Sequence, residues 1–239
     1  SAPLFTWPKP DKDAPLGNEP HGRPVVYQAG KNDILLGMTR KGGKHGFGVV
    51  YRYDTSPGLD NPMQVLHDFA GKEQADGATP FHGNLVLVGT SVYGLTCNGG
   101  EHDGGVAFVT THVDDPAKSR THVLWHFGGK LDKGPDGKNP YGTLLRHGDW
   151  YYGTTDNGGA NNTGTIFRFR LDTEGTRIAE YQQLASFDAE AGNRTGAHPR
   201  DNLTAIGNRL YGMAYSGGNN GKNLHDSYGT IFAAELPEE

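Results

Sequence analysis

The stretch YGTTDNGGANNTGTIF (152–167) decides the fold of this 239-residue chain, because four versions of it occur along the sequence. Each version has a lone glycine in an apolar run, then a Gly-Gly pair, and ends in an aromatic residue. The other versions are LLGMTRKGGKHGFGVVY (35–51), VYGLTCNGGEHDGGVAF (92–108) and LYGMAYSGGNNGKNLHDSYGTIF (210–232). Their first glycines, Gly37, Gly94, Gly153 and Gly212, recur at a nearly constant interval. A regular period of this kind indicates a repeat architecture such as a propeller.

Each repeat divides into four short strands. An alternating run that ends in an aromatic residue (64–69) is followed by a polar loop that ends at Pro80, and then by NLVLVG (84–89), SVYGLT (91–96) and GVAFVTTHV (105–113). Four antiparallel strands in about 58 residues suit one propeller blade. The sequence therefore predicts an all-β, four-bladed β-propeller that forms a single domain over 1–239. The predicted repeats are about 1–56, 62–115, 121–173 and 180–237.

The N-terminus has a predicted role in closing the ring. If the NLVLVG-type strand is innermost and the others follow outward, the last repeat ends after its third strand, TIFAAEL (230–236). The segment 4–7 aligns with the outer-strand runs, because the interval from Trp7 to Pro20 closely matches the interval from the strand's last aromatic residue to the loop proline in the other repeats. We therefore expect the N-terminal strand to pair with the last blade, which leaves no long exposed edge.

With these motifs the chain resembles the GloVer-type tandem-repeat proteins of bacteria over nearly its whole length. The resemblance is carried by the YGTTDNGGANNTGTIF-type segment, the aromatic-ended strand before it and a turn of the G-N-L-Y-G type. It implies an exported β-propeller and transfers no catalytic residue. The first repeat departs from the pattern with Leu36 before its glycine, where the others have tyrosine. The fourth has an insertion, roughly KNLHDS, in its Gly-Gly loop.

The repeated glycines and tyrosines have structural interpretations. The Gly-Gly pairs indicate turns that need positive φ, which glycine adopts without penalty. They precede strands, not helices, so the helix-terminus physics of a phosphate loop is absent. The lone glycine is expected to let neighbouring blades approach or to form a bulge, and the tyrosine before it to pack between blades. The segment 132–139 lacks the alternating acidic ligands of a calcium loop and is expected to be a solvated turn.

Composition excludes several classes of function. The net charge is −5 without a long run of one sign, which argues against a nucleic-acid-binding face. No segment approaches the ~20 apolar residues that span a membrane. Cys97 is the only cysteine, so no internal disulfide forms, and we expect it to be a packed thiol and not a nucleophile. We expect no cofactor, a monomer, and a secreted or periplasmic location, which a cysteine-poor β protein rich in Gly, Asn and Thr fits.

One face of the predicted propeller carries the long loops. Antiparallel alternation places the Gly-Gly hairpins on the same face as the loops that end at the prolines, and binding residues concentrate on loops held by a rigid scaffold. The proline-ended loops bring His21, Phe81, His82, Tyr141, His198 and Arg200 to the channel mouth, and the Gly-Gly hairpins add His45, His102, Asn161, Asn162 and His225. Histidine recurs on this face, either as a functional group or as an inherited, solvent-facing one. Trp150 is also assigned to these loops.

Two functions compete for this face. The first is recognition of a glycan or a protein partner, in which Phe81, Tyr141, Trp150 and the asparagines provide the contacts. The second is a polysaccharide lyase, which needs a base, a carboxylate partner and an acid; His82 or His198 is the candidate base, Arg200 the carboxylate partner and Tyr141 the acid. A glycosidase requires two facing carboxylates, and Asp201 has no partner by spacing. A three-histidine metal site at the channel is a third hypothesis.

Overall fold

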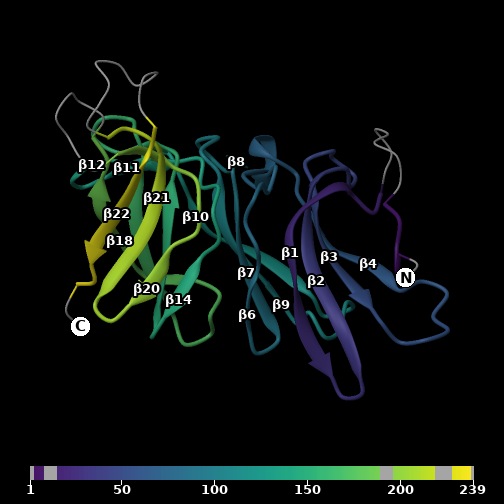
Figure 1. Ribbon diagram of the computed structural model, residues 1–239. Helices are drawn as coiled ribbons and strands as arrows, with labels where there is room; N and C mark the ends of the chain where they lie inside the picture. The colour runs from purple at the N-terminus through teal and green to yellow at the C-terminus, as the bar shows by residue number, and fades with distance from the viewer. Residues whose placement is uncertain (1–2, 8–14, 189–195, 219–227, 238–239) are drawn as a thin grey trace.

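The structure is a computed structural model that describes residues 3–7, 15–188, 196–218 and 228–237. It is an all-β chain whose one assigned helical turn in these residues is η1, a 3₁₀ turn (Lys72–Gln74). Among the described residues, no helix has the length and apolar character to cross a bilayer. The sheets follow one another from the N-terminal side to the C-terminal side of the molecule, and the chain ends lie on opposite sides (Figure 1).

The strand order within the sheets confirms the prediction. The first sheet has the order β1 (Asn18–Ala29), β2 (Asn32–Lys41), β3 (Val49–Asp54) and β4 (Met63–Asp68). The second has β6 (Val86–Val88), β7 (Ser91–Thr96), β9 (Val106–Thr111) and β10 (Arg120–His126), and the third β14 (Leu145–His147), β15 (Trp150–Thr155), β17 (Thr165–Leu171) and β18 (Ile178–Ser186). In the fourth, β20 (Thr204–Ile206), β21 (Arg209–Ser216) and β22 (Thr230–Glu235) pair in that order.

Short strands connect the long loops to the Gly-Gly hairpins. The pairs are β5 (Gly77–Ala78) with β8 (Asn98–Gly99), β13 (Gly137–Lys138) with β16 (Asn157–Gly158), β19 (Ala197–Pro199) with β21, and β11 (Lys130–Leu131) with β12 (Gly134–Pro135) within one loop. The Gly-Gly pairs have positive φ, as in Gly158 (78°) and Gly159 (74°), which confirms the predicted turns. Apart from the pair within one loop, this backbone pairing holds each long loop to the sheet that follows it.

Three apolar cores join successive sheets. One includes Met38, Val50 and Phe108, the next Leu95 and Phe167, and the third Ile166, Leu210 and Phe232. The inner strands are also linked by hydrogen bonds that repeat along the chain: Arg23 N–H donates to Asn84 Oδ1, Asn84 N–H to Thr143 Oγ1 (2.8 Å), and Thr143 N–H to Asn202 Oδ1 (2.7 Å). The same hydrogen bond, from a backbone N–H of one sheet to a side-chain oxygen of the next, thus helps to set the position of each sheet relative to the next.

The lone glycines serve a purpose different from the one predicted. A Cβ at Gly153 would collide with the ring of Phe167, its partner on the next strand of the same sheet, and Gly94 and Gly212 have the same relation to Phe108 and Phe232. The glycine therefore makes room for an aromatic ring within its own sheet and is not required for the approach of a neighbouring blade. These rings are fully or almost fully buried.

The structure does not confirm the predicted pairing of the N-terminus with the last blade. Residues 3–7 form no strand, and Tyr53 Oη donates a hydrogen bond to the carbonyl of Leu4 (2.9 Å). Phe5 and Trp7 pack on the first sheet, in the cluster that contains Tyr51. The N-terminal segment therefore contacts the first sheet and does not pair with β22. Pairing of the two ends within one chain would also require the sheets to curve far enough around the axis to bring the first sheet beside the last.

Candidate functional site

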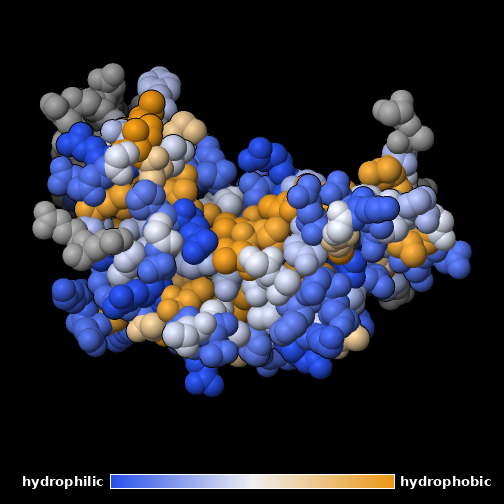
Figure 2. Space-filling view, turned by 90° about the horizontal axis from the view of Figure 1, so that it is seen from below, coloured by the Kyte–Doolittle hydropathy of each residue, from blue (hydrophilic) through white to orange (hydrophobic). Residues whose placement is uncertain are grey.

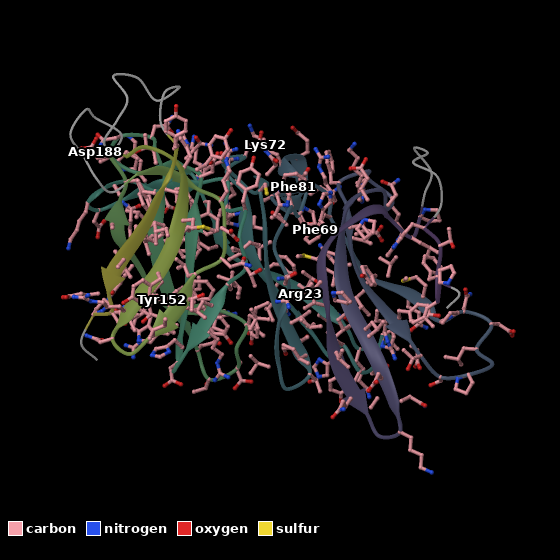
Figure 3. The ribbon with its side chains drawn as sticks, in the orientation of Figure 1. Arg23, Phe69, Lys72, Phe81, Tyr152 and Asp188 are labelled. Carbon is pink, nitrogen blue, oxygen red and sulfur yellow. The ribbon has the colours of Figure 1, made fainter. Side chains whose placement is uncertain are left out.

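Four side chains from the same repeat position lie in a row on the long-loop face. They follow the loop prolines and are His21, Phe81, Tyr141 and Arg200. The ring centroids of His21 and Phe81 are 4.8 Å apart, those of Phe81 and Tyr141 5.7 Å, and the Arg200 guanidinium lies 5.7 Å from the Tyr141 ring. Phe81 lies towards the same side of the molecule as Lys72 and the long loops (Figure 3). We call this row, together with His82, the loop-face cluster.

His82 is an additional residue in the second repeat. It lies between Phe81 and Gly83, whereas His21 and Tyr141 are followed directly by the equivalent glycine. Its φ of 61° is in the left-handed region, and its ring lies 3.8 Å from that of Phe81 and 5.4 Å from that of His21. The insertion thus turns an exposed imidazole towards the row. Burial, followed by the charges of His82 and Arg40, lowers the pKa of His21.

A second repeat position supports the row from the side. Arg40, Cys97, Asp156 and Tyr215 lie at the end of the second strand of each sheet or directly after it. The Arg40 guanidinium lies 4.7 Å from the Phe81 ring and bonds Glu19 (3.2 Å). Tyr215 receives the Arg200 guanidinium at 4.6 Å. Cys97 is buried, and burial raises the pKa of its thiol to about 12, which confirms that it is a packed thiol.

Asp156 organises the cationic end of the cluster. Its buried carboxylate accepts hydrogen bonds from Arg200 Nε (2.7 Å) and Asn157 Nδ2 (2.9 Å). His198 Nδ1 lies 2.9 Å from the Asp156 carbonyl oxygen and 3.5 Å from its carboxylate. The hydrogen bond that Arg200 donates to Asp156 raises the pKa of Arg200, and burial raises the pKa of Tyr141. Arg200 and His198 therefore share one carboxylate, and Tyr141 keeps its proton.

The Gly-Gly hairpins carry the other predicted binding residues. His45, His102 and Asn161 are exposed, with His102 lying over Gly129. Asn162 has a φ of 56° and its Oδ1 accepts a hydrogen bond from Gly158 N–H (3.0 Å), so it holds its own hairpin in shape. His225 lies outside the described residues. The part of the chain that the structure describes contains no group of three His, Cys, Asp or Glu side chains arranged to hold a metal ion.

Two residues assigned to solvent or to loops are buried. Trp150 begins β15, is 8% exposed, and packs against the Arg168 guanidinium at 3.8 Å, so it does not belong to the long-loop face. Asp136, in the segment expected to be a solvated turn, is 1% exposed and accepts hydrogen bonds from Trp125 Nε1 and Tyr181 Oη, both at 2.8 Å. Burial raises the pKa of Asp136 despite these donors.

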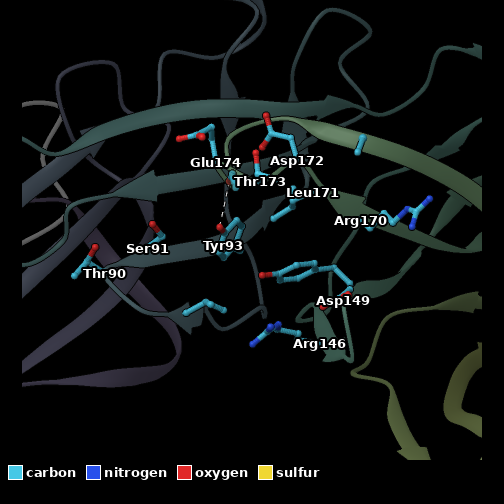
Figure 4. A pocket seen from close by; sticks show the side chains of 14 residues that line it. Thr90, Ser91, Tyr93, Arg146, Asp149, Arg170, Leu171, Asp172, Thr173 and Glu174 are labelled. Carbon is cyan, nitrogen blue, oxygen red and sulfur yellow. Dashed lines mark hydrogen bonds between the residues drawn. The ribbon is translucent and has the colours of Figure 1, made fainter.

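A groove on the opposite, short-turn face was not anticipated from the sequence. It has a volume of about 760 Å³ and lies between the second and third sheets (Figure 4). Tyr93 and Tyr151 line it with rings 5.0 Å apart, and Tyr93 Oη donates to the Gly175 carbonyl (3.1 Å). Arg146, Asp149 and Glu174 complete its margin. Figure 2 shows this side of the molecule, with apolar surface between hydrophilic margins. From the sequence, Tyr93 is expected only to pack between blades, and Tyr151 has no assigned role.

Comparison with known proteins identifies a repeat family. The Gloeobacter/Verrucomicrobia repeat matches residues 114–238. No curated protein sequence matches the chain. Among solved structures, a GH43B protein of a Bacteroides ovatus xyloglucan locus is 17% identical, with a TM-score of 0.42, 93% of this chain covered and 40% of that chain. A GH43 endo-arabinanase from Bacillus licheniformis is 12% identical, with a TM-score of 0.40 and coverages of 90% and 73%. The chain thus spans well under half of the first protein's length, and likenesses this low assign no residue and no activity.

Proposed function

Because the chain belongs to the Gloeobacter/Verrucomicrobia repeat family and its own repeats build similar sheets, we propose that it is a four-bladed propeller-type recognition protein that binds a glycan through the loop-face cluster. One observation carries the proposal. A single position in each of the four repeats supplies His21, Phe81, Tyr141 and Arg200, which contact one another in sequence. Rings and a guanidinium in a row form a platform that is apolar in its middle and polar at its ends.

The chemistry of this row fits a sugar chain. Partly buried aromatic rings offer flat apolar faces to the C–H surfaces of sugar rings, while a few placed polar groups fix their hydroxyls. Arg200 is paired with Asp156, and Arg40 and Lys41 share Glu19, so each of these cations lies beside a carboxylate. Paired guanidinium and carboxylate groups present donors and acceptors side by side. The balance of charge favours a neutral glycan over a polyuronate.

The lyase hypothesis uses the same residues and is less well supported. The proposed carboxylate partner, Arg200, is already bonded to Asp156. Of the two candidate bases, His198 has its Nδ1 against the Asp156 carbonyl, whereas His82 is exposed. A lyase would need Arg200 free to bind a uronate and an imidazole free to take the C5 proton. The high pKa of Tyr141 suits an acid but is equally expected of a buried binding residue.

Binding of soluble neutral oligosaccharides, measured by calorimetry, tests the recognition proposal. Phe81→Ala and Tyr141→Ala should each weaken binding about ten-fold or more, since each removes a stacking face. Phe47→Ala is the matched control, because Phe47 is a 42% exposed ring of the first Gly-Gly hairpin outside the cluster. Equal loss in the control, or no binding to any of a broad panel, would contradict the proposal.

A polyuronate screen tests the alternative. Elimination forms an unsaturated product that absorbs in the near ultraviolet, and either His82→Ala or His198→Ala should abolish it. Absorbance that grows with time and needs one of these histidines would replace recognition by catalysis. A protein ligand for the same face would appear as binding that Phe81→Ala weakens without any glycan. We also propose a secreted or periplasmic location, which fractionation of the source cells tests.

A further inference from the structure

The fourth sheet exposes a face that is buried in each of the other three. The residue after the lone glycine is 4% exposed at Met38, 4% at Leu95 and 2% at Thr154, but 53% at Met213. Its partner on the third strand shows the same contrast: Val50 and Ala107 are 0% exposed and Ile166 3%, whereas Ile231 is 81% exposed. The register is identical in all four sheets, so the exposure reflects what covers them.

In the first three sheets the cover is the following sheet. Met38 and Val50 lie in one core with Phe108, Leu95 and Ala107 in the next with Phe167, and Ile166 in the third with Phe232. Sequence at these positions stays apolar in the fourth sheet, although nothing described covers Met213 and Ile231. Exposed apolar patches of this kind indicate an interaction site, and the repeat shows the shape of its partner: another sheet of the same kind.

A surface complementary to this exposed face is present on the first sheet, at the other end of the molecule. The aromatic residue at the end of each outer strand packs on an aromatic residue of the next sheet: Phe69 on Phe108 (5.2 Å), Phe127 on Phe167 (5.0 Å) and Phe187 on Phe232 (4.9 Å). Trp7 packs on Tyr51 at 5.0 Å with an interplanar angle of 67°, within the range of the other three. Residues 4–7 therefore occupy the place that the end of a preceding sheet's outer strand would take.

The two halves cannot meet within one chain in this structure, because they lie on opposite sides of the molecule (Figure 1). Within the described residues, β22 has β21 as its neighbour and no outer strand is assigned beside it. We propose that a second copy of the chain docks its first sheet on this fourth sheet, with residues 4–7 of that copy lying beside β22. The contact joins unlike surfaces, so it is heterologous, and it closes into a ring or continues according to the rotation between copies.

This proposal departs from the expected monomer and does not depend on glycan binding. It also rests on a different part of the molecule, since Met213 and Ile231 lie on the outward face of the last sheet and take no part in the row formed by His21, Phe81 and Tyr141. A chain that self-associates and binds no sugar would thus refute the proposed function alone. A monomer that binds sugar would refute this inference alone.

Sedimentation equilibrium of the full chain over a wide concentration range tests the inference. The unaltered chain should show a mass above the monomer, and Ile231→Asp should weaken association on the order of 100-fold, because it places an unpaired charge in the centre of the contact. Leu4→Asp, at a residue 70% exposed on the complementary end, should weaken it as well. Phe47→Asp, an equivalent change at an exposed ring that lies beside Gly71 on the side of the second sheet, should leave association unchanged. Circular dichroism confirms that each variant is folded.

Mixing the two variants gives the sharper result. The Leu4→Asp chain keeps an intact fourth sheet and the Ile231→Asp chain keeps an intact first sheet. An equimolar mixture should therefore form heterodimers, whereas each variant alone should self-associate only weakly. Failure of the mixture to associate would indicate contact between like surfaces and overturn the proposal. A monomeric mass for the unaltered chain at all concentrations would overturn it too. So would a disulfide that joins Leu4→Cys to Ala233→Cys within one chain in the doubly substituted protein.

Discussion

Replacing Asp136 by alanine should destabilise the fold more than any change to an exposed loop residue. The Asp136 carboxylate is 1% exposed and accepts hydrogen bonds from Trp125 Nε1 (2.8 Å), Tyr181 Oη (2.8 Å) and Gly137 N–H (2.7 Å). The Trp125 and Tyr181 rings stack at 4.0 Å with an interplanar angle of 8°. The carboxylate thus joins two strands, β10 and β18, of adjacent sheets to the loop between β10 and β14.

The expected loss in the free energy of unfolding is about 3–5 kcal/mol, because each buried donor left without an acceptor costs roughly 1–3 kcal/mol and the losses of donors that share one carboxylate are not additive. Asp136→Asn keeps one acceptor oxygen but turns an amide N–H₂ towards existing donors, so about 1–2 kcal/mol is expected. Urea unfolding followed by tryptophan fluorescence measures both values, and circular dichroism separates loss of stability from loss of structure.

Asp132→Ala is the matched control, because Asp132 is an exposed carboxylate earlier in the same loop. Exposed substitutions without defined contacts usually change stability by less than about 0.5 kcal/mol. If Asp136→Ala and Asp132→Ala cost the same, or if Asp136→Ala costs less than about 1 kcal/mol, the network does not hold this loop and the reasoning is refuted.

Three further predictions follow from single contacts. Burial opposes ionisation of Asp76, but the hydrogen bond and charge of His67 and two backbone donors lower its pKa overall. The ionised carboxylate therefore contributes stability above its ordinary pKa, and this contribution is lost as the pH falls through the lower, folded pKa. Asp76→Asn should accordingly flatten the acid limb of a pH–stability curve. Gly153→Ala should cost about 1–3 kcal/mol because the new Cβ meets the Phe167 ring, and a smaller residue at 167 should recover part of it in thermal unfolding. Cys97, whose pKa is raised to about 12, should react with thiol reagents at neutral pH only on unfolding, and fast native labelling would contradict its burial.

Local features of the fold were predictable because they depend on residues close in sequence. Positive φ at Gly158 and Gly159 follows from the turn they form, and the strand order follows from the spacing of Gly153 and its equivalents. The alignment of Trp7 with the last aromatic residues of the outer strands could also be predicted from the sequence. The packing of Trp7 on Tyr51 agrees with this alignment. These features need only a repeat and the chemistry of glycine and aromatic residues.

The closure of the ring was not predictable, because it depends on the rotation between sheets summed over the whole array. The period of the sequence repeat gives the number of sheets but not the angle by which each sheet is rotated about the axis relative to the one before it. The burial of Asp136 was missed for a related reason, since its partners Trp125 and Tyr181 come from other elements. The groove beside Tyr93 likewise depends on the loop at Gly175, which is distant in the sequence.

The loop-face cluster differs from the rest of the repeat in one informative way. Positions that build the sheets hold the same kind of residue in each repeat, a glycine facing an aromatic ring, because each sheet has the same packing problem. The position after the loop proline holds an imidazole, a phenyl ring, a phenol and a guanidinium. A purely structural position would have no reason to diverge in chemistry while its neighbours stay alike. Four different groups in one row make a directional surface, so the ligand of this face should bind in one orientation, with its more polar end at Arg200 and Asp156. Paramagnetic labelling of one end of a bound oligosaccharide should accordingly broaden signals near Arg200 or near His21, but not both.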